Sequence, residues 1–429
     1  MDLFVTRERK LEKVKIIDNI RREFSFISGN YRVLIISWII MDLAMEMPSP
    51  NFQYYVQALG GTGLELGIIG LANFLALAIV AFPGGYLADK YGRRRLITTM
   101  TFGMAMSYLF FAFAISWHFI LIGTLLNSVC LIYQPALFAM VQDSVPTERR
   151  GMGSSLTQLI HGAFNTPGPI IAGFLFLKFG LVMSMRLIYL LMTLLFLIAA
   201  VWRLRLTETM RNRDPIQLKY FVSSYPTAIR ESLKVWKIVP RSTLWLFVGQ
   251  IIVMFGMALI QVINAVYARD VLLIPEEQWW LTFIPLLLMM IVASIPIGMM
   301  IDRMGRKIPL ILGVLTSALG SWLFMNGDLV TIMIAMALFG IAQIAFMAGS
   351  SALFADLVQQ ENRGKVIGFT NFAGYIAMGF GMLLGNYLYL SSSPQMPFLG
   401  TLMLAIPELL IILLLIHEPK EKAASIQDS

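Results

Sequence analysis

Apolar residues fill the chain in runs of about 20 residues, and short polar stretches separate the runs. The runs lie near residues 32–55, 64–88, 96–116, 118–142, 152–176, 180–204, 242–268, 277–301, 308–325, 329–355, 364–390 and 398–417. A membrane-spanning helix needs about 20 apolar residues, whereas a spanning β-strand needs only about 10. The pattern therefore predicts an all-α membrane protein with twelve transmembrane helices.

Composition and charge fit this interpretation and orient the helices. The chain is 58% hydrophobic and 14% charged, a balance typical of a protein whose solvent is the bilayer. If the basic N-terminal stretch "RERKLEKVK" is cytoplasmic, only Lys178, Arg186 and Arg269 of the 33 Lys and Arg residues fall elsewhere than on the cytoplasmic side. We therefore expect both termini to be cytoplasmic. The net charge of +8 indicates contact with anionic membrane lipids and no nucleic-acid partner.

The two halves of the chain resemble each other. "GYLADKYGRRR" at 85–95 matches "GMMIDRMGRKI" at 298–308, and the same offset relates Asp143 to Asp356 and Arg150 to Arg363. Two separate loops that share one offset indicate a duplicated six-helix unit. The predicted divisions are a cytoplasmic N-terminal segment (1–30), a first six-helix bundle (31–205), a cytoplasmic linker (206–241), a second six-helix bundle (242–417) and a cytoplasmic tail (418–429).

These loops resemble the inner-loop signature G-x-x-x-D-[RK]-x-G-[RK]-[RK] of the major facilitator superfamily. The resemblance implies two bundles that rock around a central site, with a charged latch at the inner loops that biases one facing state. The latch residues it implies are Gly85, Asp89, Gly92, Arg93, Arg94, Asp302, Gly305 and Arg306. We expect Asp89 to pair with an arginine of the same or a neighbouring inner loop. The alternative is that these charges only anchor the turns among lipid headgroups.

The fifth apolar segment resembles an element of exporters in this family. It holds Gly168, Pro169 and Gly173, which predict close packing against a neighbouring helix, the eighth, and a bend at Pro169. This favours export over import, although close packing alone explains the glycines equally well. The fourth segment departs from the exporter pattern, because it lacks the arginine that proton-coupled members often carry there.

Polar and thioether side chains recur on segments that line the central cavity in this fold. The candidates for substrate contact are Asn127, Gln134, Gln158, Asn165, Gln250, Met254, Met257, Gln261, Asn264, Gln343 and Met347. Methionine suits a forgiving pocket for lipophilic compounds. For each amide, a hydrogen bond that only joins two helices is an equally good explanation.

Charged side chains inside apolar segments are the candidates for proton or cation coupling, because burying them is costly. Asp42 and Glu46 lie one helical turn apart, so one of them is expected to hold a proton. His161 is a candidate relay or substrate ligand, with a packing role as the alternative. Arg186 and Glu408 are weaker candidates, each either structural or involved in transport.

Together these features predict a monomeric, multi-pass plasma-membrane transporter that exports small lipophilic or cationic compounds in exchange for protons. The alternatives are uptake of a small metabolite, uptake of a metal ion bound by Asp42 and His161, and a receptor that transports nothing. An enzyme is not expected, because the chain has three histidines and no catalytic or P-loop spacing. No cofactor and no resident metal are expected.

Overall fold

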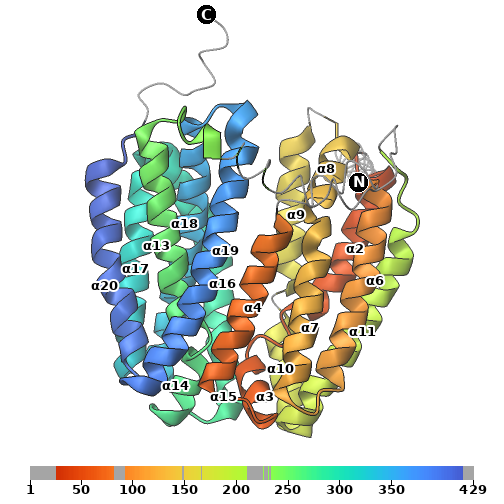
Figure 1. Cartoon of the computed structure of the whole chain (residues 1–429), viewed down its shortest axis with the longest axis vertical. Coiled ribbons are helices and arrows are strands. Elements are labelled where there is room, and N and C mark those ends of the chain that lie inside the picture. The colour runs from red at the N-terminus through yellow and green to blue at the C-terminus, as the bar shows by residue number, and fades with distance from the viewer. Residues whose placement is uncertain are drawn as a thin grey trace, which may run out of the picture.

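The computed structural model describes residues 26–81, 92–146, 149–165, 167–209, 226, 230 and 233–418, and these residues form helices and no strand (Figure 1). The first half contains α2 (Gly29–Met45), α3 (Phe52–Ala58), α4 (Gly63–Ala81), α6 (Arg93–Ala112), α7 (Trp117–Cys130), η1 (Leu131–Tyr133), α8 (Gln134–Ser144), α9 (Arg150–Asn165), α10 (Pro167–Phe179) and α11 (Leu181–Arg203). The second half contains α13 (Arg241–Gln261), α14 (Asn264–Asp270), α15 (Glu276–Trp279), η3 (Trp280–Thr282), α16 (Phe283–Met304), α17 (Lys307–Asn326), α18 (Leu329–Leu357), α19 (Gln360–Ser391), α20 (Met396–Leu410) and η4 (Ile411–Leu415).

Nine helical stretches in the described part of the chain are long and apolar enough to cross a membrane. They coincide with nine of the twelve predicted segments. The other three segments are also helical but are shorter, less apolar or divided: α2 with α3, α6, and α9 with α10. The prediction of an all-helical membrane protein is confirmed, whereas the count of twelve stays a prediction.

The first predicted segment is divided because its prolines stop the helix. α2 ends at Met45, and residues 46–51 form turns in which Ser49 N donates to Glu46 O. Pro48 has no N–H to donate and disfavours helical backbone at the preceding residue. The chain becomes helical again in α3. Glu46 therefore lies just after α2 rather than inside it.

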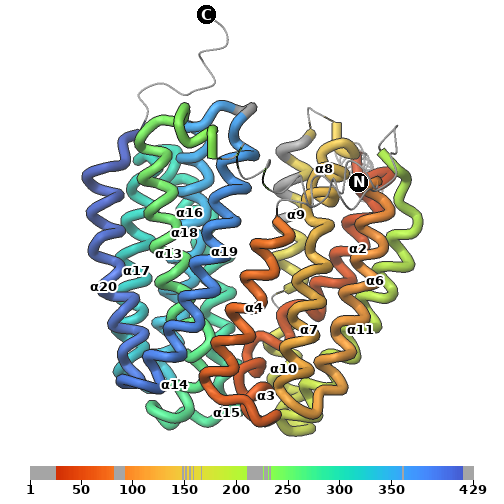
Figure 2. Tube along the Cα trace, viewed as in Figure 1, coloured from red at the N-terminus to blue at the C-terminus, as the bar shows by residue number. Residues whose placement is uncertain are grey.

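The helices gather into two groups that meet along α4 and α19 (Figure 2). Glycines allow this close approach: a Cβ on Gly70 would lie 2.4 Å from Met382 Sδ, and one on Gly67 would lie 3.2 Å from Leu383 Cα. Phe74 and Tyr375 face each other across the same interface, with ring centroids 6.0 Å apart. These contacts join residues 63–74 of α4 to residues 375–390 of α19.

A second region of contact lies at one end of the molecule, which we call the Trp280 end. There α3 contacts α14, and α10 contacts α15, η3 and α16 (Figure 1). Tyr54 Oη donates to Ala265 O at 2.7 Å, and this hydrogen bond joins the two halves. The opposite end, where α6 and α17 begin and α11 and η4 finish, is called the Arg93 end.

Candidate functional site

Asp42 and His161 form a pair in the interior of the first half. The Asp42 carboxylate, in the last turn of α2, forms a hydrogen bond with the imidazole of His161 in α9. Asp42 Oδ2 lies 2.6 Å from His161 Nδ1. The Asp42 side chain is 8% exposed and the His161 side chain 34% exposed. The two residues were both predicted as coupling groups, and the structure brings them together.

Trp38 holds the imidazole of His161 from a second direction. Its ring centroid lies 5.3 Å from that of His161, and Trp38 is one turn before Asp42 on the same helix. One proton lies between Nδ1 and Oδ2 in this geometry, whichever atom carries it. The imidazole is therefore held between the Asp42 carboxylate and the Trp38 ring.

Glu46 does not share this pair. Its Oε2 accepts a hydrogen bond of 2.6 Å from Ser49 Oγ, within the turn that follows α2. The backbone of Glu46 and Met47 packs on Gly168, where a Cβ would lie 3.0 Å from Met47 N. The predicted side-by-side carboxylate site is thus replaced by two acids with separate partners.

The glycines of the fifth segment contact two different neighbours. Gly168 lies against the turn after α2 rather than against the eighth segment, whereas Gly173 lies against the Trp280 ring, where a Cβ would be 2.3 Å from Cδ2. Pro169 lies in the first turn of α10, where its missing N–H costs no helical hydrogen bond. The predicted bend at Pro169 stays a prediction.

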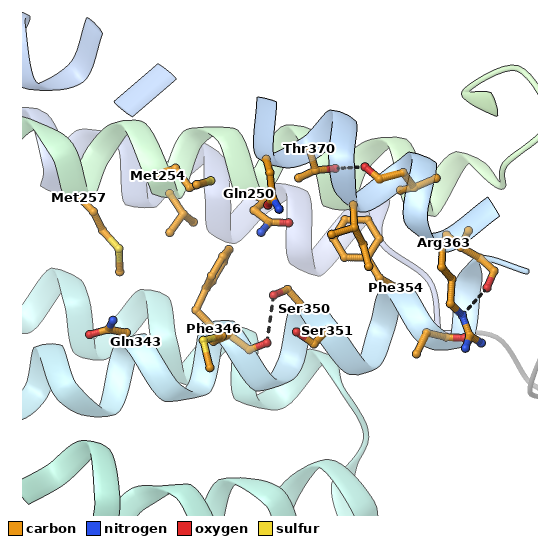
Figure 3. A pocket seen from close by; sticks show the side chains of 17 residues that line it. Gln250, Met254, Met257, Gln343, Phe346, Ser350, Ser351, Phe354, Arg363 and Thr370 are labelled. Carbon is orange, nitrogen blue, oxygen red and sulfur yellow. Dashed lines mark hydrogen bonds between the residues drawn. The ribbon is translucent and has the colours of Figure 1, made fainter. Parts of the chain in front are cut away.

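The second half contains a cavity of about 390 Å³ between α13, α18 and α19 (Figure 3). Five predicted residues line it: Gln250, Met254, Met257, Gln343 and Met347. Met257 extends from α13 toward Gln343 and Phe346 of α18 (Figure 3).

The lining of this α13–α18–α19 cavity is amphipathic. Gln250 Oε1 is buried and has no hydrogen-bond partner within the described residues, so it is available to a bound molecule. Arg363 is the one charged residue of the described lining, and its guanidinium donates to Val358 O at 2.9 Å and to Ala355 O. Because Arg363 follows the end of α18, the cavity reaches the Arg93 end.

The other predicted cavity residues lie apart from this lining. Asn127 Nδ2 donates to Ser107 Oγ at 3.0 Å, which joins α7 to α6 as the alternative explanation proposed. Asn264 Oδ1 accepts from Ala265 N, and Gln261 ends α13, so neither continues the row of cavity-lining side chains on α13. Gln134 is exposed, and Asn165 Oδ1 is buried without a partner in the described part of the chain. The side chain of Gln158 lies outside the described residues.

The signature loops form the same turn in both halves. Gly92 and Gly305 each have φ +93, in the left-handed region that favours glycine. A carboxylate caps the helix that follows: Glu208 Oε1 accepts from Arg93 N at 3.1 Å, and Glu418 Oε1 accepts from Arg306 N at 2.8 Å. The repeat therefore has a structural reason that does not depend on a ligand.

The arginines of these turns pair within their own half. Arg93 pairs with Asp143, and Arg306 Nε lies 2.6 Å from Asp356 Oδ2. Arg94 donates to Leu204 O at 2.8 Å, and its counterpart Lys307 donates to Leu413 O at 3.1 Å.

Asp302 takes no part in these pairs. It is exposed and makes no ion pair with another described residue, whereas Gly85 and Asp89 lie outside the described residues. The expected pairing of Asp89 therefore stays a prediction. Arg306 pairs with Asp356, which the repeat itself singled out.

Arg203 is a functional candidate that the sequence analysis missed, because it was counted among the cytoplasmic cations. It is fully buried: Nε donates to Ser37 Oγ at 2.9 Å and a terminal nitrogen donates to Thr101 Oγ1 at 2.8 Å. The guanidinium also lies over the Tyr133 ring. Its place as the last residue of α11, one helical turn after the apolar residues Ala199 and Ala200, was the available signal.

The two weaker candidates are both intramembrane but differ in their partners. Arg186 donates to Ala114 O at 3.0 Å, which closes the first half at the Trp280 end. Glu408 is 7% exposed in α20. No group of three or more His, Cys, Asp and Glu side chains that could hold a metal ion comes together within the described ranges.

Comparison with known proteins assigns this architecture. The sequence profile described as Major Facilitator Superfamily matches residues 34–260 and 246–428. An uncharacterised transporter of this type from Methanocaldococcus jannaschii is 25% identical over 90% of this chain and 95% of its own. The multi-drug resistance efflux pump PmrA of Streptococcus pneumoniae is 23% identical, over 83% and 88%. The crystal structure of the nucleoside transporter NupG superposes with a TM-score of 0.66 at 15% identity, over 91% and 99%, a likeness of fold alone.

Proposed function

Because the chain belongs to the major facilitator superfamily, and is thus a membrane transporter of small molecules rather than an enzyme, we propose that it exports lipophilic or cationic compounds in exchange for protons. The proposal includes twelve helices with both termini in the cytoplasm of a plasma-membrane monomer. The bundles would comprise residues 31–205 and 242–417, joined by the linker 206–241. The bias of basic residues toward one side supports this orientation.

The observation that carries the proposal is the contact between Asp42 and His161. It is a titratable pair, mostly buried, on two helices of one half. Protonation of Asp42 removes the negative charge that holds His161, and deprotonation restores it. Because the pair joins α2 to α9, a change in its proton occupancy alters how firmly these helices are held together.

The α13–α18–α19 cavity supplies the substrate surface in this proposal. Its methionines adapt to differently shaped apolar groups, while Gln250 and Gln343 offer hydrogen bonds without a fixed charge. With Tyr54 and α10 contacting the second half at the Trp280 end, we assign the structure to a state open at the Arg93 end, which is the cytoplasmic side in this orientation.

The test is gradient-driven transport by the purified chain in proteoliposomes, with ethidium as the probe cation. We expect an imposed pH gradient to drive ethidium across the membrane, and Asp42→Asn to reduce this flux about 5- to 150-fold, the usual range for coupling between linked sites. His161→Gln should act in the same direction. The matched control is Glu65→Gln, because the Glu65 carboxylate bonds only to Thr62 at the start of α4.

Two results would count against the proposal. If Asp42→Asn transports ethidium as fast as the unmodified protein under a pH gradient, the pair has no part in the mechanism. If ethidium flux through the unmodified protein does not depend on the pH gradient, the transport is facilitated diffusion rather than exchange. Uptake coupled to proton entry would appear as ethidium moving in the same direction as the protons.

A further inference from the structure

α20 carries a single acid, Glu408, in the interior of the second half. The residue is 7% exposed, and its carboxylate makes no hydrogen bond or ion pair with any other described residue. An ionised carboxylate without a partner costs far more to bury than the neutral acid. Burial therefore favours the protonated form of Glu408 in this conformation.

Charged groups on the elements packed against α20 do not reach Glu408. These elements are α13, α17, α18, α19 and η4 with the residues after it. Their described charged and titratable side chains are Arg241, Lys307, Asp356, Arg363, Lys365, Tyr375, Tyr387, Tyr389, His417 and Glu418. None of them lines the space at Glu408.

The Glu408 carboxylate borders a small cavity of about 30 Å³ between α13, α17, α18 and α20. This volume is enough for a single water molecule. Ser317 lines it too, as does Thr401, whose hydroxyl is already donated to Gly256 O at 3.0 Å. Apart from Glu408, Ser317 and Thr401, the lining of this space is apolar.

Only a thin wall separates this space from the α13–α18–α19 cavity. Val253, Met257 and Phe346 line both cavities. Figure 3 shows Met257 and Phe346 from the side of the larger cavity. Since methionine is flexible, this wall can open by rotation of side chains without movement of a helix.

The backbone at Glu408 is irregular on both sides. Pro407 lies inside α20 and removes one helical hydrogen bond, and a π-helical turn, Ile411–Leu415, follows. Such turns inside helices are frequent at functional sites. The backbone on both sides of Glu408 therefore departs from the regular α-helical hydrogen-bond pattern.

We propose that Glu408 is a proton-binding site of the second half, which holds its proton in this conformation and exchanges it with the α13–α18–α19 cavity through the wall of Val253, Met257 and Phe346. The bond that forms and breaks is the O–H bond of the carboxyl group, and the proton passes to or from water in the larger cavity. Its use in transport rests on the proposed function, but the binding of the proton does not.

Infrared spectroscopy of the purified full chain in detergent tests the proposal. We expect the carbonyl stretch of a neutral carboxylic acid at neutral pH, and its loss in Glu408→Gln. The band should persist in Asp42→Asn and in Glu65→Gln. No such band in the unmodified protein, or an unchanged band in Glu408→Gln, would overturn the proposal. If Glu408→Gln fails to fold, Glu408→Asp serves instead: a shifted band supports the assignment and an unshifted band opposes it.

Deuterium exchange tests the route. Transfer into D₂O should shift the band at a measurable rate, and Met257→Trp should slow that shift severalfold because the larger ring blocks the wall. An unchanged rate would rule out this path. Loss of ethidium flux with the band intact would refute the proposed function alone, whereas flux with no band would refute only this inference.

Discussion

The two halves share their turns but differ in their interiors. At the Arg93 end, glycine, arginine, aspartate and a capping glutamate recur in each half with the same contacts. Inside, the first half holds the Asp42–His161 pair and the buried cation Arg203, whereas the second half buries the acid Glu408 beside a cavity whose described lining has Arg363 as its one charged residue. The repeated contacts hold the turns of the backbone, whereas the buried charged and titratable groups differ between the halves.

The largest expected effect concerns the buried cation of the first half. Arg203→Ala should lower the free energy of unfolding by about 2–5 kcal/mol, as for other large-to-small core changes, because it leaves a cavity and frees Ser37 and Thr101. Thermal unfolding in detergent measures it. Glu408→Gln, which replaces a neutral acid by a neutral amide, is the comparison in the second half and should change stability far less. Equal losses would remove this difference between the interiors.

The next prediction concerns the shared turns. Glu208→Ala and Glu418→Ala should each destabilise the protein by about 0.5–2 kcal/mol, the usual cost of losing a helix cap. The same thermal measurement applies to both variants. If only one variant unfolds at a lower temperature than the unmodified protein, the two capping glutamates contribute unequally to stability.

A smaller effect is expected in the α13–α18–α19 cavity. Gln250→Leu should weaken binding of a polar or cationic probe about 2- to 12-fold, the equivalent of one hydrogen bond of about 0.5–1.5 kcal/mol. Ethidium fluorescence titration measures the affinity. Asn127→Leu is a useful contrast, since Asn127 bonds to Ser107 in the first half and should leave the affinity unchanged. If only Asn127→Leu lowers the affinity for ethidium, the substrate site lies in the first half.

The smallest effect is at the starts of two corresponding helices. Asp328 caps α18, and its side chain accepts from Thr331 N at 2.9 Å, whereas Ser116 makes no side-chain cap for α7. These bonds to Thr331 lower the pKa of Asp328. Its contribution is therefore present above the ordinary pKa of an aspartate and is lost as the pH falls through the lowered value.

Asp328→Ala should accordingly lower the unfolding temperature slightly at neutral pH, and the difference from the unmodified protein should vanish in acid. Ser116→Ala should have no effect at either pH. A loss of stability in Ser116→Ala that matches that of Asp328→Ala would show that the two helix starts are capped alike.

The sequence by itself determined the class of protein and its repeat. Long apolar runs require helices in a bilayer, because the backbone must satisfy its own hydrogen bonds there. The paired loops predicted equivalent turns, and Gly92 and Gly305 adopt the same positive φ. The prolines after Asp42 were visible too, although their effect of ending α2 before Glu46 was not predicted.

Only the tertiary structure decided which polar groups meet. Asp42 and His161 are 119 positions apart, and Arg203 reaches Ser37 from 166 positions away. Helices that are apolar on nearly every face give little indication of how each is rotated in the bundle, so spacing along one helix could not choose between Glu46 and His161 as the partner of Asp42. The packing of the helices against one another brought Asp42 to His161 in the first half and left Glu408 without a described partner in the second.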